Sequence, residues 1–277
     1  MPTASLSTGV EMYYEERGSG TPLLLHYGTG GDHAAWEPQV EQLSAAFRVI
    51  TPDPRGTGKT GGRFDRWTMA AFAEDVIALL DSLSIERVHI GGMSMGSAVC
   101  QEIAIRHPKR VDRLVLSNTW GQTDRRLRLL WEHSLFVMEA AANAPATEQE
   151  AWQTKLYEHG IATFFSSDAL ERREDMIAQW WHLYSSGLRE DAGRGHWDAM
   201  LSHNALSRLP GVTAPTLIIA GEEDYFGLSH PRQVHNAIPG ATLEVMRDSG
   251  SSHGLLWERA DEANQIIGTF LSESKAT

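Results

Sequence analysis

One serine stands between glycines in a pattern that can carry out nucleophilic chemistry. Ser94 is the centre of Gly92-Met93-Ser94-Met95-Gly96, which follows a β-type run and precedes helical residues. So tight a turn from strand to helix holds the serine in a strained backbone conformation and requires small residues two positions away. The hydroxyl then stands above the sheet, where the start of the next helix and the Met95 N–H can stabilise an oxyanion. The spacing predicts a nucleophile.

Two other glycine-rich motifs do not fit the chain. A dinucleotide fingerprint, G-x-G-x-x-G, fails because the third position counted from Gly91 is Met93. A phosphate loop, G-x-x-x-x-G-K-[ST], fails because Asp53 occupies the place of its first glycine, ahead of Gly58–Thr60. The sequence also has no HExxH motif and no cluster of Cys and His. We therefore expect neither a cofactor nor a metal.

A serine becomes a strong nucleophile when a base takes its proton and an acid holds that base. Asp224 follows the strand-like run TLIIAG, and His253 follows the last strand-like run. Both would lie with Ser94 at the carboxyl edge of a parallel sheet, where active sites form. The chain order Ser, Asp, His is one that such triads use. Glu222 and Glu223 are alternatives to Asp224, which we favour because it lies clear of the strand end.

The second oxyanion donor is expected in the loop after the apolar run 22–28. There the Thr29 N–H is our candidate, and an ordinary glycine-rich turn is the alternative. No partner spacing supports a chemical role for four further histidines, which we expect to be ordinary core or solvated residues: His107, His133, His159 and His235.

Alternating strand and helix patterns must position these groups. Strands are expected over 10–18, 22–28, 47–53, 87–92, 111–118, 214–224 and 241–250, and helices over 33–47, 68–84, 97–108, 230–238 and 258–271. Such alternation indicates βαβ units and a mostly parallel twisted sheet flanked by helices, an α/β fold. It stops between 121 and 206, where helices are expected over 124–141, 147–165 and 168–188. We predict a core domain of 1–120 and 207–277 with an inserted helical domain, 121–206.

Composition excludes several classes of partner. The chain of 277 residues has a net charge of −12, which repels nucleic acid and anionic membrane surfaces. No apolar run approaches the ~18 residues of a membrane span, and the N-terminus lacks a signal-peptide pattern. The single cysteine, Cys100, excludes an internal disulfide and is expected to be a small buried hydrophobe. We expect a cytoplasmic protein with a small-molecule substrate.

Five blocks together carry a family resemblance: LLLHYGTGG…W, PDPRGTGKT, GGMSMGSA, PTLIIAGEED and SGSSHGLLWE. Over nearly its whole length the chain resembles the α/β-hydrolase superfamily. Through SMGSAVCQEIAIRHPKRVDRLVLSNTWG it looks most like the 3-oxoadipate enol-lactonase and small-carboxylesterase group. The resemblance implies the α/β-hydrolase fold, a catalytic triad of Ser94, His253 and Asp224, backbone oxyanion donors at Thr29 and Met95, and a helical cap over the site.

The chain departs from the family at two positions. Tyr27 precedes Gly28 where the family usually has histidine, and Ser252 precedes His253 where glycine is frequent. The first departure bears on the shape of the oxyanion loop. Serine at position 94 separates the chain from the dehalogenase and epoxide hydrolase branches, which have aspartate there.

Aromatic residues of the insertion are candidates for binding substrate. Trp180 and Trp181 point about 100° apart on a helix, so we expect one of them to face the pocket. Tyr27, in the oxyanion loop, is the third candidate. Of the two methionines beside Ser94, we expect Met95 to border the pocket and Met93 to pack in the core.

The predicted activity is hydrolysis of a small carboxylic ester or lactone through an acyl-enzyme, with an apolar or aromatic substrate. A C–C bond hydrolase acting on β-diketone-like ring-cleavage products would use the same three residues. A ligand receptor with slow turnover is an alternative of another class, because a fold does not fix a function. Acyl transfer to an alcohol or peroxide instead of water also remains open, as does the oligomeric state.

Overall fold

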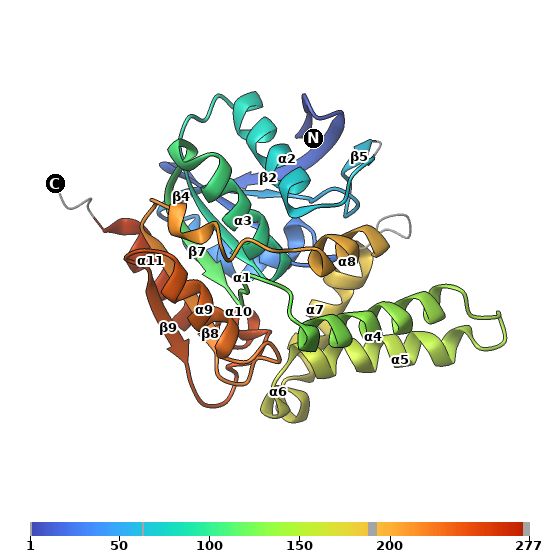
Figure 1. Cartoon of the computed structure of the whole chain (residues 1–277). Helices are drawn as coiled ribbons and strands as arrows, with labels where there is room; N and C mark the ends of the chain where they lie inside the picture. Colours follow the sequence, from blue (N-terminus) through green and yellow to red (C-terminus); the bar gives the residue numbers. More distant parts are fainter. Residues whose placement is uncertain (1, 63, 188–192, 274–277) are drawn as a thin grey trace.

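A single mixed sheet forms the centre of the molecule. The computed structural model describes residues 2–62, 64–187 and 193–273. Within these ranges nine strands have the order β1-β2-β4-β3-β6-β7-β8-β9, with β5 beside β2 (Figure 1). The strands are β1 Thr3–Ser5, β2 Val10–Arg17, β3 Thr21–His26, β4 Phe47–Pro52, β5 Gly61–Gly62, β6 Val88–Met93, β7 Val111–Ser117, β8 Thr216–Gly221 and β9 Thr242–Met246.

The pairs from β4 across to β9 are parallel, whereas β2 is antiparallel to β1, β4 and β5. The predicted mostly parallel α/β sheet is therefore confirmed. The central strands β3 and β8 contain unbroken apolar runs because both of their faces are buried. In β3, Leu24 packs into the core on one face, while Leu23 and Leu25 pack into the core on the other.

Helices cover both faces of the sheet. They are α1 Glu37–Leu43, α2 Met69–Ser82, α3 Met95–Arg106, α9 Ser229–Ala237, α10 Leu255–Glu258 and α11 Ala260–Ser272. Buried residues of α2, α3 and α9 share the Leu24 face, and those of α1, α10 and α11 share the opposite face. Short 3-10 turns occupy His33–Trp36, Pro108–Arg110 and Leu209–Gly211. None of the helices in the described ranges is long and apolar enough to cross a membrane.

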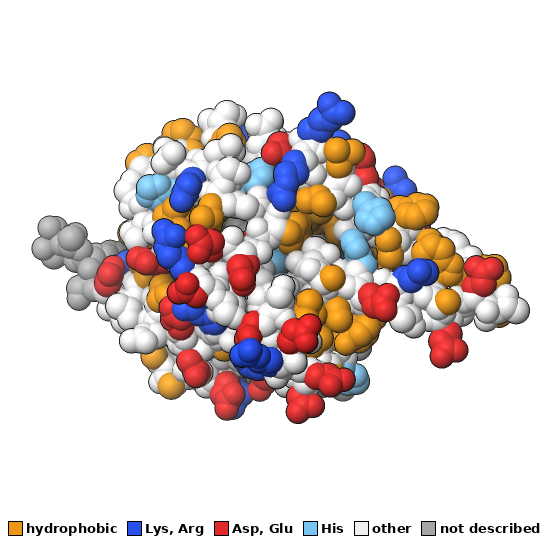
Figure 2. All heavy atoms as spheres, turned by 90° about the horizontal axis from the view of Figure 1, so that it is seen from below, with side chains coloured by type: hydrophobic (Ala, Val, Ile, Leu, Met, Phe, Trp, Pro, Cys, Tyr) orange, Lys and Arg blue, Asp and Glu red, His pale blue; other side chains and the backbone are white. Residues whose placement is uncertain are grey.

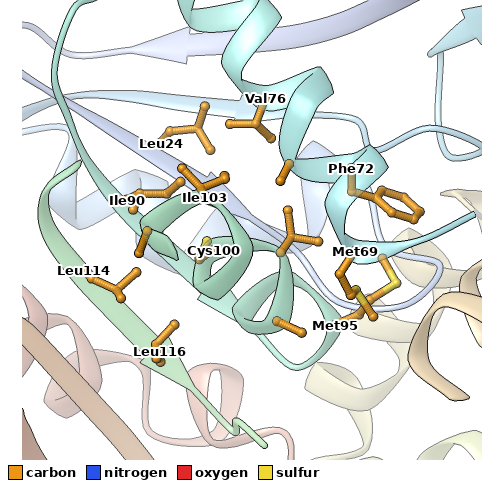
Figure 3. Packing of buried hydrophobic residues seen from close by; sticks show 14 of the residues in the cluster. Leu24, Met69, Phe72, Val76, Ile90, Met95, Cys100, Ile103, Leu114 and Leu116 are labelled. Atoms are coloured by element: carbon orange, nitrogen blue, oxygen red, sulfur yellow. The ribbon is translucent and has the colours of Figure 1, made fainter. Parts of the chain in front are cut away.

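Helix α3, which begins beside Ser94, is anchored in the largest hydrophobic core. Cys100 and Ile103 on this helix lie near Ile90 of β6 and Leu114 of β7, and all four side chains are fully buried (Figure 3). Cys100 is a free thiol whose pKa is raised by burial, as expected for a small hydrophobic residue without chemical function. The start of α3 therefore rests on a close-packed support.

Between β7 and β8 the chain is helical. The helices are α4 Arg125–Ala142, α5 Gln149–Phe164, α6 Ser167–Arg172, α7 Glu174–Gly187 and α8 Gly193–Leu201, and they are called the helical segment below. Asp124 and Ser166 cap α4 and α6 by accepting hydrogen bonds from backbone N–H groups three residues on. Helices α4 and α5 lie side by side and project away from the sheet (Figure 1).

The structure differs from the predicted elements at four places. The helix expected over 168–188 is divided at Arg173, which has φ −125° and ψ 41°, and its last residue lies outside the described ranges. Helix α8 was not predicted because it contains Gly193 and Gly195. A Cβ at Gly195 would lie 2.0 Å from the Trp67 ring, so this glycine serves close packing. Strands β1 and β5 are too short for a clear alternating pattern.

Candidate active site

Ser94 lies in the tight turn between β6 and α3. Its backbone has φ 53° and ψ −124°, a conformation that costs a residue other than glycine about 1–3 kcal/mol. A Cβ on Gly92 would lie 2.2 Å from the Gly96 carbonyl oxygen, and one on Gly96 would lie 1.9 Å from that of His26. Both flanking positions therefore require glycine, for the steric reason that the sequence suggests.

His253 and Asp224 meet at the same edge of the sheet, in the loops after β9 and β8. The distance from His253 Nδ1 to Asp224 Oδ1 is 2.9 Å, and both side chains are buried. Asp224 also accepts hydrogen bonds from the Phe226 N–H at 3.0 Å and from Asn118 Nδ2 at 2.7 Å. Burial alone would raise the pKa of Asp224, but the imidazole of His253 and these hydrogen bonds outweigh it and lower the pKa.

The neighbouring acids do not share this position. Glu222 is exposed and pairs with Arg247 at 3.1 Å, and Glu223 is also exposed. Of the three acids considered from the sequence, the structure brings Asp224 to the imidazole of His253.

Asn118 is a site residue that the sequence analysis missed. It follows β7 directly, has a left-handed φ of 49°, and accepts a hydrogen bond from Ser117 Oγ while its amide donates to Asp224. Asparagine adopts this backbone conformation more readily than most residues. The rule that located Asp224, a polar residue just after a parallel strand, applies equally to Asn118.

A cavity of about 270 Å³ adjoins these groups. Ser94 and His253 both line it, together with the three predicted substrate-binding residues Tyr27, Trp180 and Trp181. None of the described residues that line it is Lys, Arg, Asp or Glu. Figure 2 shows the molecule from below, and on this face hydrophobic side chains gather on the side toward which the α4–α5 hairpin projects. The cavity offers aromatic surface and uncharged polar groups to a ligand.

The predicted oxyanion donors, Thr29 and Met95, belong to two segments that adjoin Ser94. A Cβ on Gly28 would lie 3.1 Å from the Ser94 Cβ, so this loop approaches the serine closely. Thr29 lines the cavity, and its hydroxyl contacts Met200 Sδ of α8 at 2.7 Å. Met95 is the first residue of α3, where backbone N–H groups have no partner within the helix.

Gly30, the residue after Thr29, is hydrogen-bonded to α8. Buried His196 accepts a hydrogen bond at Nδ1 from the Gly30 N–H at 3.2 Å and contacts the Arg55 carbonyl through Nε2 at 2.8 Å. Burial lowers its pKa to about 4, which favours the neutral ring. Because that carbonyl only accepts, Nε2 carries the proton and Nδ1 is free to accept from Gly30.

The expected roles of the two methionine side chains were reversed. Met93 lines the cavity, whereas Met95 is fully buried in the core beneath α3. Met93 is the last residue of β6 and Met95 the first of α3, so the turn at Ser94 directs them to opposite sides of the sheet.

Both tryptophans face the cavity, although only one was expected to. The Trp180 ring stacks on Phe164 with a centroid distance of 4.2 Å, and its Nε1 donates to the Tyr27 hydroxyl at 3.4 Å. Trp181 lies against Gly160 of α5, where a Cβ would be 2.9 Å from the indole. The missing side chain at Gly160 lets the second ring lie across α5 and reach the cavity despite its different direction on α7.

Hydrogen bonds join the end of helix α5 directly to the loop that carries His253. The Phe164 carbonyl accepts hydrogen bonds from the Gly254 N–H at 2.6 Å and from Ser252 Oγ at 2.8 Å. Ser252 Oγ also bonds to Glu258, which accepts from the Ser166 hydroxyl as well. Serine in place of the family's frequent glycine at position 252 therefore joins the helical segment to the imidazole loop.

One of the four histidines expected to be ordinary, His159, lines the cavity. Its Nε2 lies 2.8 Å from Ser134 Oγ, which lines the cavity from α4. No sequence motif signals this pair, because the pairing depends on how α4 packs against α5.

A second cluster of polar side chains lies outside the residues that line this cavity. Ligand atoms of Asp32, His33 and Asp53 lie within 4.8 Å of one another, an arrangement that a metal ion could use. Hydrogen bonds already occupy much of this cluster: Asp53 accepts from His33 at 2.6 Å and from the Lys59 N–H at 2.7 Å, and Asp32 accepts from the Ala34 N–H at 2.9 Å. These bonds give it a structural role in shaping the loop after β4.

Sheet order, helix positions and the turn at Ser94 define a known class of fold. Residues 21–260 match the alpha/beta hydrolase fold family, and the chain belongs to that family. The resemblance identified from the five sequence blocks is thus confirmed.

Individual relatives include hydrolases of different names. A protein of Yersinia enterocolitica with the provisional name carbamate hydrolase RutD is 30% identical over 268 residues. These residues cover 94% of this chain and 92% of the relative. The enol-lactonase of Burkholderia xenovorans superposes with a TM-score of 0.83 at 26% identity, covering 98% of this chain and 100% of that chain. A hydrolase from Pseudomonas aeruginosa has a TM-score of 0.83 and 26% identity, covering 98% of both chains.

Proposed function

We propose that the protein is a serine hydrolase that cleaves an uncharged carboxylic ester or lactone through an acyl-enzyme. The observation that carries this proposal is the 2.9 Å contact between His253 and Asp224, on the wall of a cavity that Ser94 also lines. Nδ1 of the imidazole is engaged by the carboxylate, which leaves Nε2 as the nitrogen that can take the serine proton.

The proposed reaction has two halves. His253 Nε2 removes the Ser94 proton as Oγ attacks the carbonyl carbon, and Asp224 stabilises the imidazolium that results. The N–H groups of Thr29 and Met95 bind the tetrahedral oxyanion, each contributing about 3 kcal/mol. The imidazolium then protonates the leaving alcohol oxygen. Water, deprotonated by the same imidazole, cleaves the acyl-enzyme, releases the acid and regenerates the serine hydroxyl.

The lining of the cavity supports an apolar or aromatic substrate. Tyr27, Phe164, Trp180, Trp181 and Tyr184 all line it, and such rings bury large apolar areas. Without a lysine or arginine among the described lining residues, a carboxylate on the substrate would lose its hydration without an ion pair. We therefore propose a neutral substrate.

We further propose that residues 121–206 act as a cap on a core domain formed by 1–120 and 207–277. Support comes from the cavity, since residues of α4, α5, α7 and α8 line it together with Ser94 and His253. The cap would supply most of the aromatic surface that selects a substrate, and the core would supply the reacting groups.

Carbamate cleavage is a second candidate function, favoured by the RutD relative. It uses the same attack on a carbonyl carbon, but one of its final products is an amine or ammonia. The aromatic cavity of about 270 Å³ favours a substrate with a large apolar part over carbamate itself. Matched esters and carbamates that carry the same aryl group would rank the two activities.

The proposal is tested by labelling the protein with a fluorophosphonate and mapping the modified peptide. The label is expected on Ser94, and Ser94→Ala should abolish labelling and lower kcat by about 10⁶-fold. Ser202→Ala, which removes a serine hydroxyl bonded to the Ala199 carbonyl, is the control and should change neither. Labelling of another residue, or full activity in Ser94→Ala, would refute the assignment.

A preference for a β-diketone-like dienoate over every ester would favour C–C hydrolysis. Tight ligand binding with turnover near that of water would favour a receptor.

A further inference from the structure

The cavity contains a second Ser–His pair, separate from Ser94 and His253. Ser134 of α4 and His159 of α5 both line it, and Ser134 Oγ lies 2.8 Å from His159 Nε2. Both side chains are half-buried. The pair is thus a hydrogen-bonded polar group on the wall of a cavity that is otherwise rich in aromatic rings.

The pair is separated from the reacting groups by Phe164 of α5. Phe164 packs against the His253 ring, with a centroid distance of 5.5 Å. His159 precedes Phe164 by five positions, so it lies about 7–8 Å farther along the helix axis. Helices α4 and α5 project together away from the sheet (Figure 1), and the pair lies near the middle of both helices.

The side chains facing the cavity on these helices follow a helical stripe. On α5, Gln153, Leu156, Gly160 and Thr163 recur at intervals of three and four residues, with His159 beside them. On α4, Ser134 and Met138 are four residues apart. The cavity therefore extends along the hairpin, and a ligand bound at Ser94 has a continuous wall to follow as far as His159.

The pair has hydrogen-bonding capacity without charge. Ser134 Oγ is also 3.1 Å from the Leu130 carbonyl, so its proton can be donated to that carbonyl or to His159 Nε2; in the second case the ring proton is on Nδ1, which is then free to donate to a ligand. Burial, reinforced by the neighbouring His133 ring, lowers the pKa of His159 and favours the neutral imidazole. A hydroxyl and a neutral imidazole provide more donors and acceptors than these two contacts use.

We propose that Ser134 and His159 form a subsite that binds an uncharged hydrogen-bonding group of the substrate, a ketone, hydroxyl or amide, in the part of the cavity beyond Phe164 from the scissile carbonyl. This inference rests on the proposed hydrolase function at Ser94. It narrows the substrate class to neutral esters or lactones with an apolar spacer and a polar distal group. The aromatic rings between the two sites would bind the spacer, and the pair would fix its register.

Matched ester substrates test the subsite. One series of pairs carries a ketone or its methylene isostere on the acyl side, behind apolar spacers of graded length, and a second series carries them on the alcohol side. The native protein is expected to prefer the ketone of one pair by about 3- to 10-fold in kcat/KM, as for a net neutral hydrogen bond. Ser134→Ala and His159→Leu should reduce that preference to less than twofold.

Thr154→Ala is the matched control. Thr154 lies on α5, is exposed, and bonds to the carbonyl four residues earlier as Ser134 does, but it does not line the cavity. It should retain the preference. Equal rates for ketone and methylene in every pair, or a preference that survives both substitutions, would overturn the subsite. His159→Gln provides a second variant should His159→Leu fold poorly.

A binding measurement separates this inference from the proposed function. Ser94→Ala is titrated with each ester while the fluorescence of the cavity tryptophans is followed. The ketone is expected to bind about 3- to 10-fold more tightly than its isostere, and Ser134→Ala in the same background should remove the difference. If Ser94→Ala hydrolyses the esters at the native rate, the proposed function fails, whereas equal binding of ketone and isostere contradicts the subsite alone.

Discussion

The sheet edge and the helical segment meet at the same cavity but are built differently. At the sheet edge, Ser94, Asp224 and His253 are fixed by a strained turn, by glycines that leave no room for a Cβ, and by a carboxylate with three hydrogen-bond donors. In the helical segment, Trp180 and Trp181 are held by ring contacts with centroid distances of 4.2 to 6.1 Å.

The difference indicates two degrees of tolerance to substitution. A group that reacts must be held within a few tenths of an ångström, which hydrogen bonds and close backbone packing achieve. An apolar surface that selects a substrate needs only approximate shape, because burial of apolar area is not directional. The sheet edge should therefore respond to substitution with loss of rate or of folding, and the helical segment with a change of preference.

The largest expected effect tests the acid at the sheet edge. Asp224→Asn keeps the shape but removes the charge that would stabilise the proposed His253 imidazolium, so kcat should fall by about 10⁴-fold while the fold persists. Steady-state kinetics with an aryl ester and circular dichroism measure the two quantities. Glu223→Gln changes an adjacent exposed acid and should stay within twofold of native. Equal losses in both variants would remove the special position of Asp224.

A second substitution tests the steric demand of the turn. Gly96→Ala places a Cβ 1.9 Å from a backbone oxygen and should lower the free energy of unfolding by about 3 kcal/mol or more. Gly211→Ala is the control, since a Cβ there meets nothing within 4 Å, and it should change the free energy by less than about 0.5 kcal/mol. Urea denaturation compares them. Similar stabilities would mean that the turn relaxes more easily than its backbone contacts indicate.

The junction between the two regions gives a pH-dependent effect. The pKa of buried His196 is about 4, against 6.5 for an unperturbed histidine. Between these values the unfolded chain binds a proton that the folded protein does not, so stability falls as pH falls from about 6.5 to 4. His196→Gln should lessen this slope by up to about 1.4 kcal/mol per pH unit.

Urea unfolding of the native protein and of His196→Gln at several pH values measures the two slopes. His182→Gln, which replaces an exposed histidine on α7, is the control and should follow the native curve. Parallel curves for His196→Gln and the native protein would contradict a neutral His196 in the folded state.

The smallest expected effect lies in the helical segment. Trp181→Ala should lower kcat/KM for an aryl ester by about tenfold, with little loss for a methyl ester and little change in thermal stability, because Trp181 is only half-buried. Trp180→Ala removes a ring that is 2% exposed and should also cost about 3–5 kcal/mol of stability. Equal loss for both esters in Trp181→Ala would show that this ring does not select the substrate.

The sequence predicts the sheet edge well because its signals are local. Gly92 and Gly96 are close in the chain to Ser94, and Asp224 and His253 each follow a recognisable strand. The helical segment depends on contacts between distant residues. The approach of Trp181 to Gly160 and the pairing of Ser134 with His159 arise from helix packing, which single-sequence periodicity does not specify. The two methionines show the same limit, since the direction of the turn decides which one faces the ligand.

The bond from Gly254 to the last carbonyl of α5 makes the two regions mechanically continuous. A rearrangement of α5 that widens the cavity for a larger substrate must either move the His253 loop as well or break the hydrogen bonds to the Phe164 carbonyl. Substrate range and the proposed proton transfer at His253 therefore cannot change independently along this helix. Substitutions that broaden the substrate range without lowering the rate should therefore accumulate on α7. Its tryptophan rings line the cavity but, within the described residues, make no hydrogen bond to the backbone of the His253 loop.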